Sequence, residues 1–228
     1  MTINLNHQHQ ICNFLFVILA IISALLLSGN YGYNVYALDK EENSLVVDYS
    51  KFNAKETRIS ADRYFQMALE SQNNEETQKY LQEAEAQYYI LSNLDKADAY
   101  PCIQLGRIYD LQQNDAYAKA YYYRALGLNY KNPDANHYFA EFYYKRKQYK
   151  KALEYYQNAL KYGKTEDSDT LKKLGKIYER FGDIQRTNLY YKKSFELNPK
   201  DSELLNKINE NVKQEYEKSG YYKRRLRY

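Results

Sequence analysis

A thiol and an imidazole are the two side chains in this sequence that could supply a nucleophile and its base. Cys102 and His137 are the only cysteine and histidine beyond residue 12. A nucleophilic site needs such a pair within hydrogen-bonding distance, with neighbours that tune its pKa values. Alignment of the chain's internal repeats places Cys102 inward and His137 on the concave side. We therefore predict no Cys-His catalytic site.

Metal and phosphate chemistry is not indicated either. A zinc site built from Cys and His needs several such residues, and only one of each remains beyond residue 37. The 8 glycines are scattered and form no phosphate-binding loop. The Asp and Glu residues lie mostly on solvated helix faces, and no pair stands out by its spacing. The sequence thus predicts no enzyme, no cofactor and no metal site.

The N-terminal segment is predicted to be a signal peptide over residues 1–37. Residues 11–28 are apolar, no charged residue precedes Asp39, and Val35, Tyr36 and Ala37 form a cleavage pattern before Leu38. The apolar run is also just long enough for a membrane span, so an uncleaved anchor stays open. With either outcome we expect the rest of the chain to be extracytoplasmic, secreted or periplasmic.

Positive charge gathers at the other end, in SGYYKRRLRY at 219–228. The cations of this basic tail are Lys223, Arg224, Arg225 and Arg227. A solvated chain end is the plain interpretation, and contact with anionic lipid headgroups or an acidic partner stays open. Nucleic acid ranks below these, because an exported protein seldom meets it. The net charge of +4 is too mild to indicate it.

Two registers of residues repeat along the middle of the chain. The stretches LGRIY, FAEFY and LGKIY begin at Leu105, Phe139 and Leu174, which are 34 and 35 residues apart. A small residue, a Tyr and a second small residue then recur thirteen residues after each start. These sets are Ala118, Tyr122 and Ala125; Ala152, Tyr156 and Ala159; and Thr187, Tyr191 and Ser194. A fixed period in this range predicts stacked structural repeats.

Each repeat is predicted to be a hairpin of two helices. Apolar and small residues recur at helical intervals in both halves. Turn residues separate the halves at 112–115, 145–148 and 181–183, and Asn-Pro pairs end the units before 134 and 200. One hairpin cannot bury both of its faces, so neighbours must stack on it. The predicted fold class is all-α, a superhelix (α-solenoid) of stacked helical hairpins.

These units resemble tetratricopeptide repeats. The stretch KRKQYKKALEYYQNAL is close to the second helix of that family, and LGxxY is its first-helix signature. The resemblance covers three copies, 99–132, 133–167 and 168–201, and implies a right-handed superhelix that binds proteins. The sequence departs from the family in two ways. Cys102, Asn136 and Leu171 stand where Trp is frequent, and Thr187 and Ser194 replace alanines.

The flanking segments complete the predicted organisation. Residues 38–59 show no period and are interpreted as a linker, and 60–98 as a degenerate hairpin with an insertion around NNEET. Residues 202–218 are predicted to be a capping helix, because one stripe of that segment is apolar and the rest is polar. The stripe consists of Leu205, Ile208 and Val212.

The tyrosine-rich stretches are interpreted as packing. A stacking platform for a ligand would need rings on one exposed surface, whereas these recur at core places of the family. Tyr122, Tyr156 and Tyr191 are expected to point into each hairpin. Their neighbours Tyr121, Tyr155 and Tyr190, about 100° round the helix, are expected to pack toward the next unit or on the convex face. Gly106, Ala140 and Gly175 should allow the two helices to approach closely.

The resemblance also implies a binding groove, because the first helix of each hairpin lines the concave face in this family. The places carried over are Tyr100, Ile103, Arg107, Asp110, Asp134, His137, Glu141, Tyr144, Asp169, Lys172, Lys176 and Arg180. They do not match the lysine and asparagine clamp with which some relatives hold a carboxylate. We expect Lys172 and Lys176 to be exposed. The charge predicts a partner segment that is acidic at one end and apolar or aromatic at the other.

We interpret the sequence as an exported scaffold that binds a peptide or partner protein in this groove. The alternative is a structural envelope protein, anchored in the membrane by residues 11–28, whose basic tail contacts lipid or a surface polymer. The first interpretation rests on the family resemblance, since the periodicity alone predicts only the architecture.

Overall fold

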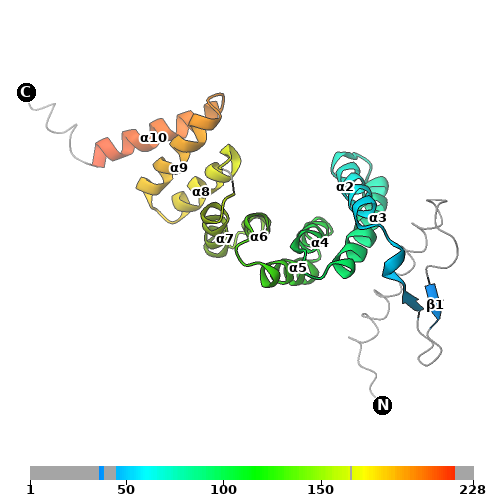
Figure 1. Ribbon diagram of the computed structural model, residues 1–228. Coiled ribbons are helices and arrows are strands. Elements are labelled where there is room, and N and C mark those ends of the chain that lie inside the picture. The colour runs from blue at the N-terminus through cyan, green and yellow to red at the C-terminus, as the bar shows by residue number, and fades with distance from the viewer. Residues whose placement is uncertain (1–35, 39–44, 165, 219–228) are drawn as a thin grey trace, which may run out of the picture. The chain divides into compact units, whose positions relative to one another are not determined.

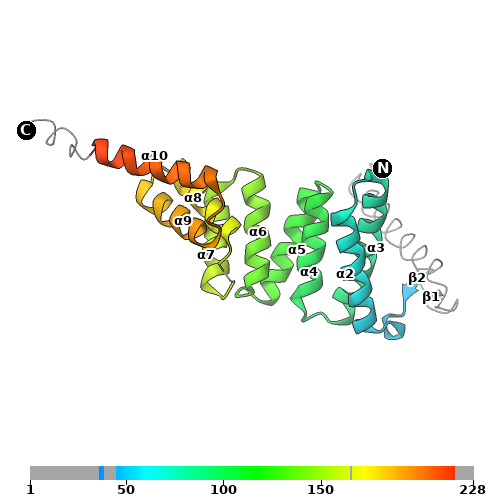
Figure 2. The same cartoon turned by 90° about the horizontal axis from the view of Figure 1, so that it is seen from above.

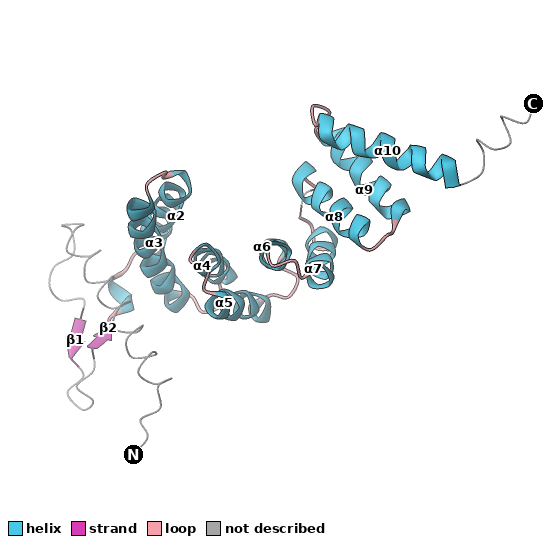
Figure 3. Ribbon diagram, turned by 180° about the vertical axis from the view of Figure 1, so that it is seen from behind, coloured by secondary structure: helices cyan, strands magenta, loops and turns pink. Residues whose placement is uncertain are grey.

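The chain folds into consecutive helical hairpins in the computed structural model, which describes residues 36–38, 45–164 and 166–218 (Figure 1). Two short antiparallel strands and a 3-10 turn precede the helices: β1 (Tyr36–Leu38), β2 (Leu45–Val47) and η1 (Tyr49–Lys51). The helices are α2 (Ala54–Glu70), α3 (Asn74–Leu94), α4 (Ala99–Leu111), α5 (Asp115–Leu128), α6 (Pro133–Lys145), α7 (Tyr149–Lys161), α8 (Ser168–Arg180), α9 (Ile184–Leu197) and α10 (Ser202–Lys218). Apart from the strand pair, the described residues confirm the all-α prediction (Figure 3).

The chain forms two compact units, with the boundary between Tyr130 and Lys131. In unit 1, α2 pairs with α3 and α4 with α5, and α3 packs against α4. In unit 2, α6 pairs with α7 and α8 with α9, α7 packs against α8, and α10 packs against α9 (Figure 2). Each unit is therefore a stack of hairpins, as the repeat pattern predicts.

Side chains of Asn and Asp begin nearly every helix. Asn53, Asp98 and Asp167, for example, accept hydrogen bonds from backbone N–H groups in the first turns of α2, α4 and α8. Asn132 caps α6, and Pro133 follows at its first position, where a missing N–H costs no hydrogen bond. These residues set the helix starts, and with them the spacing of the repeats.

The turn inside each repeat has the same backbone conformation. Gln113, Lys147 and Gly182 have φ values of 60°, 59° and 74°, the left-handed region. They stand at equivalent places, 34 and 35 residues apart. Glycine adopts this conformation without strain, so Gly182 suits the place best.

The core tyrosines lie where the sequence predicts them. Tyr122, Tyr156 and Tyr191 are 1%, 0% and 0% exposed, respectively, inside their hairpins. The glycines facing two of them leave no room for a side chain. A Cβ atom at Gly106 would lie 2.8 Å from the Tyr122 ring, and one at Gly175 would lie 2.3 Å from the Tyr191 ring. The close approach of the two helices thus depends on these glycines.

The preceding tyrosines make a contact that the sequence did not predict. Each stacks on the tyrosine that ends the LGxxY stretch of its own hairpin, and Tyr121 also packs against the core cluster of α2, α3 and α4. The centroids are 5.4 Å apart for Tyr121 on Tyr109, 5.7 Å for Tyr155 on Tyr143, and 5.4 Å for Tyr190 on Tyr178, with nearly parallel planes. The sequence did not predict this stacking because a helical wheel gives the direction of a ring but not its partner, and parallel rings gain from offset stacking.

One of the flanking predictions needs correction. The linker predicted over residues 38–59 is wrong in part, because it contains β2 and η1 and because α2 begins at Ala54. The residues NNEET, around which an insertion was predicted, belong to the start of α3: Asn73 caps this helix and the rest form its first turn. Helix α3 has 21 residues, whereas α5 has 14.

The stripe predicted for α10 is wrong at its first residue, which is Leu204 rather than Leu205. Leu204 and Ile208 are buried against Tyr191, whereas Leu205 is 40% exposed. Val212 packs at the edge of this cluster, together with Phe195. The predicted contact between α10 and the last hairpin therefore exists, but it is made at intervals of four residues starting from Leu204.

The predicted signal segment and the basic tail fall largely outside the described residues, which exclude 1–35 and 219–228. Every helix that is described is too short or too polar to cross a membrane.

Candidate partner-binding faces

The first helices of the two hairpins in unit 1 are α2 and α4. We call their partly exposed side, with Tyr100, Arg107 and Asp110, the unit 1 face. Three of the predicted groove residues, Tyr100, Arg107 and Asp110, are partly exposed on α4. Ile103 is only 2% exposed, so its place in the predicted groove is wrong. It belongs to the packed side of α4, where the apolar side chain is removed from water.

The carboxylate of Asp62, on α2, accepts hydrogen bonds from two tyrosines of this unit. Asp62 accepts hydrogen bonds from the hydroxyls of Tyr88, at 2.6 Å, and Tyr100, at 2.7 Å. Burial raises the pKa of Tyr100, and the bond to Asp62 raises it further. The Arg58 guanidinium lies 3.8 Å from the centroid of the Tyr100 ring and 3.6 Å from Asp98. Tyr100 is therefore held as a neutral, fixed ring.

Helix α2 contributes residues that the sequence reasoning missed. The Arg107 guanidinium on α4 lies 4.6 Å from the centroid of Phe65, so Phe65, Arg58 and Asp62 all meet residues of α4. The stretch ADRYFQMALES was predicted to be helical. The residues assumed to be inserted around NNEET, however, left the alignment of α2 with the first helices of the other repeats undefined. Without a register, no residue of α2 could be assigned to a face.

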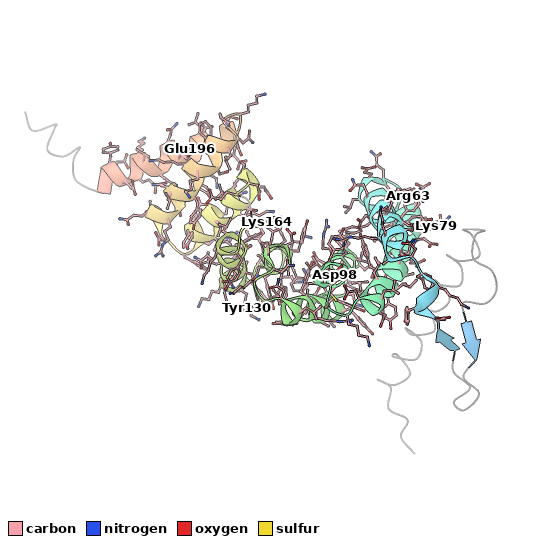
Figure 4. All side chains as sticks on the ribbon, viewed as in Figure 1. Arg63, Lys79, Asp98, Tyr130, Lys164 and Glu196 are labelled. Atoms are coloured by element: carbon pink, nitrogen blue, oxygen red, sulfur yellow. The ribbon has the colours of Figure 1, made fainter. Side chains whose placement is uncertain are left out.

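The unit 2 face begins with α6. Asp134 forms a salt bridge of 2.7 Å with Lys164, which lies in the connection to α8 (Figure 4). His137 packs edge-on against Tyr138 and Tyr156, and its Nδ1 atom is buried without a hydrogen bond among the described residues. Burial lowers the pKa of this imidazole. It is therefore a neutral, half-buried ring near neutral pH.

Glu141 is the centre of an ionic network on this face. It accepts hydrogen bonds from the Tyr156 hydroxyl and from Lys173, whose Nζ atom lies 2.8 Å from Oε2. Lys173 also forms a salt bridge with Asp169. Burial opposes the charge of Lys173, but the hydrogen bonds to Asp169 and Glu141 prevail and raise its pKa. The predicted residues Glu141 and Asp169 thus meet through a lysine that was not predicted.

Lys172 points to a different partner from the one predicted. Its Nζ atom lies 2.7 Å from Asp201, which also caps α10, and 3.6 Å from Glu203. Hydrogen bonding to Asp201 raises the pKa of Lys172, and its side chain is only 20% exposed. The expectation that Lys172 is exposed for a partner is therefore wrong, because the start of α10 occupies it.

Two cations of α8 remain available. Lys176 and Arg180 form no salt bridge with any residue that the structure describes. The Arg180 guanidinium lies 4.7 Å from the centroid of Tyr149, which in turn packs edge-on against Tyr144. This face therefore presents two cations without a salt bridge and two partly exposed rings.

Cys102 is buried in unit 1, where burial raises the pKa of its thiol. A buried thiol of raised pKa is a poor nucleophile. Within the described ranges no group of three or more His, Cys, Asp or Glu side chains is placed to hold a metal ion.

Comparison with solved structures agrees with the hairpin geometry. YrrB is 23% identical over 56% of this chain and 66% of its own, just under two thirds of its length, with a TM-score of 0.52. PilF of Pseudomonas aeruginosa is 18% identical over 71% and 72%, with a TM-score of 0.54. MamA of Desulfovibrio magneticus RS-1 is 19% identical over 74% and 89%, with a TM-score of 0.56.

The chain has the tetratricopeptide repeat fold. The TPR hairpins of this chain are α4–α5, α6–α7 and α8–α9, and α2–α3 is a further hairpin with longer helices. No protein-family model matches the sequence, and no curated protein matches it. The low identities to the solved TPR proteins show the fold alone.

Proposed function

We propose that this TPR chain is an exported, non-enzymatic scaffold that binds a segment of a partner protein on the first-helix faces of its hairpins. The fold supports a scaffold, and YrrB is described as a TPR protein with an unusual peptide-binding site. The observation that carries the proposal is the pair Lys176 and Arg180. Neither cation forms a salt bridge within the described residues, and Arg180 lies over the ring of Tyr149, which packs against Tyr144.

The salt bridges of the remaining charged residues on the unit 2 face indicate which charge a partner segment should carry. Glu141 and Asp169 share Lys173, and Lys172 is paired with Asp201, so Lys176 and Arg180 are the cations of α8 that have no salt bridge within the described residues. The remaining positive charge favours an acidic group on the partner, and the adjacent rings favour an apolar or aromatic one. The expected segment is therefore acidic at one end and apolar or aromatic at the other.

Selection of random displayed peptides on the full chain tests this assignment. We expect enrichment of segments with that pattern. The variant Lys176→Glu/Arg180→Glu should bind a selected peptide about tenfold or more weakly, and its affinity should depend less on salt, because two favourable charges become repulsive. Peptide affinity in two salt concentrations is the measurement.

A control with the same charge change is Lys161→Glu/Lys192→Glu, since both lysines are exposed on second helices. It should keep the wild-type affinity. Equal losses in both variants would show a general charge effect, and a selected peptide that binds the Lys176→Glu/Arg180→Glu variant as well as wild type would place the site elsewhere.

Export is tested by the first residue of the mature chain. Cleavage before Leu38 would remove two of the three residues of β1, and with them the pairs Tyr36 to Val47 and Ala37 to Val46. The pairing of β1 in the uncleaved chain is the observation that favours the second candidate, the anchored envelope protein. We expect intact mass of the protein from its native host to show a chain starting at Leu38. A mass that includes residues 1–37 would establish the anchor instead.

A further inference from the structure

The turn between α6 and α7 is the most basic short stretch that the structure describes. Five cations and no acidic residue occupy 145–151. We call this set the basic turn: Lys145, Arg146, Lys147, Lys150 and Lys151. The four lysines are exposed, and Arg146 is fixed over the Phe142 ring at 3.6 Å.

The next turn along unit 2 extends this charge. Arg180 ends α8 and lies over Tyr149, the first residue of α7, so the α8–α9 turn is adjacent to the basic turn. Phe181 follows Arg180 and is 44% exposed. This edge of unit 2 therefore combines exposed lysines, an arginine and an exposed aromatic side chain.

The fold does not require these cations. Unit 1 forms the same turn with Leu111, Gln112, Gln113, Ala116 and Tyr117, without one positive charge. Its other internal turn, in the hairpin α2–α3, is acidic through Glu70, Glu75 and Glu76. The charge also follows the units as a whole, since residues 131–218 carry 19 Lys and Arg against 14 Asp and Glu, whereas 45–130 carry 9 against 12. The basic turn is therefore a property of the unit 2 surface and not of the hairpin.

We infer that the basic turn, with Arg180 and Phe181, is a docking surface for an anionic lipid membrane. This surface adjoins the first-helix face of the proposed function and shares Arg180 with it, so the variants that test it leave Lys176 and Arg180 unchanged. Four of its five cations are lysines, whose flexible stems carry point charges rather than the planar fork that recognises a single carboxylate. Clustered lysines attract anionic lipid surfaces, and an exposed aromatic side chain suits the headgroup region. A flat, diffuse anionic surface matches this edge better than one acidic peptide does.

Two substitutions test the surface with little effect on the fold. Lys147→Gln places at the left-handed position the residue that unit 1 has there, Gln113. Lys150→Gln places the residue found at the equivalent position in the third copy, Gln185. The matched control is Lys161→Gln/Lys200→Gln, which removes the same charge from the other ends of the hairpins.

The measurement is co-sedimentation of the full chain with phosphatidylcholine vesicles, with and without phosphatidylglycerol. Residues 1–38 carry no Lys, Arg, Asp or Glu, so their contribution should be the same in both vesicles. We expect the anionic lipid to increase binding. Lys147→Gln/Lys150→Gln should reduce this increase about tenfold, since each lysine near such a surface contributes roughly fivefold in partitioning at most. The control variant should keep most of the increase.

Three results would overturn the inference. The first is that anionic lipid adds no binding to the wild-type chain. The second is that the two variants lose the same amount of binding, which would show an effect of net charge alone. The third concerns an acidic polypeptide. Binding of soluble polyglutamate tests whether the partner is an acidic protein instead of a membrane. If it binds the wild-type chain, loses affinity in Lys147→Gln/Lys150→Gln only, and displaces the chain from anionic vesicles, the basic turn recognises an acidic polypeptide instead.

Discussion

Deletion of residues 202–228 is expected to lower the free energy of unfolding of unit 2 by about 3–6 kcal/mol, at roughly 1.5–3 kcal/mol for each buried aliphatic side chain. The deletion removes Leu204 and Ile208, which are 0% and 7% exposed, and uncovers Tyr191 at the end of the stack. A terminal hairpin with an apolar outer face needs such a cap. Urea unfolding of the full chain and the truncated chain is the measurement.

Point variants separate the apolar contact from the rest of this segment. Leu204→Ala should cost about 2–5 kcal/mol, as expected for a buried leucine. Leu205→Ala should change stability by less than about 1 kcal/mol, because Leu205 is 40% exposed. A larger loss for Leu205→Ala than for Leu204→Ala would show that the stripe begins at Leu205, as predicted from sequence. If the truncated chain unfolds at the same urea midpoint as the full chain, α10 does not stabilise the last hairpin.

A single methyl group at Gly175 should have the second largest effect. Gly175→Ala is expected to cost about 2–3 kcal/mol through overpacking. Its Cβ atom would lie 2.3 Å and 2.4 Å from two ring carbons of Tyr191. This ring cannot easily move aside, since it is fully buried and its hydroxyl donates a hydrogen bond of 2.8 Å to Glu179. The decrease in the urea midpoint measures the cost.

Gly106 and Gly127 provide the comparison within unit 1. A Cβ atom at Gly106 would lie 2.8 Å from Tyr122, so Gly106→Ala should also destabilise, but less than Gly175→Ala. No atom lies within 4 Å of a Cβ atom at Gly127, so Gly127→Ala should stabilise α5 by about 0.5–1 kcal/mol. The second copy has Ala140 at the place of Gly175, so its two helices accept a methyl group there. A Gly175→Ala variant as stable as wild type would show that the helices of the last hairpin can also separate enough to accept one.

The period of the sequence was sufficient to predict the hairpins and their cores. Small residues and tyrosines that recur at 34 and 35 residues can be buried together only if each copy adopts the same hairpin. Tyr122, Tyr156 and Tyr191 are buried for this reason. The α2–α3 hairpin was predicted with less accuracy, because it lacks the LGxxY stretch and its longer helices hide the period.

The candidate faces were only partly predictable, as the adjacent lysines of α8 illustrate. Lys172 and Lys173 are chemically identical and lie 100° apart on the helix. Only packing shows that Lys173 meets Glu141 and Asp169, and that Lys172 meets Asp201 from the segment before α10. Local spacing places a charge on a face, but it does not select the ion partner from another helix.

The sequence by itself determined the all-α class, the hairpin unit, the turns and the buried tyrosines, because each follows from periodicity within about 35 residues. Tertiary structure alone decided contacts between elements: the tyrosine stacks, the salt bridges of α8 and the buried stripe of α10. Leu204 and Leu205 show the reason. Each lies on the same side of the helix as Ile208, three or four residues away. Only the position of Tyr191 on another helix decides which of the two leucines is buried.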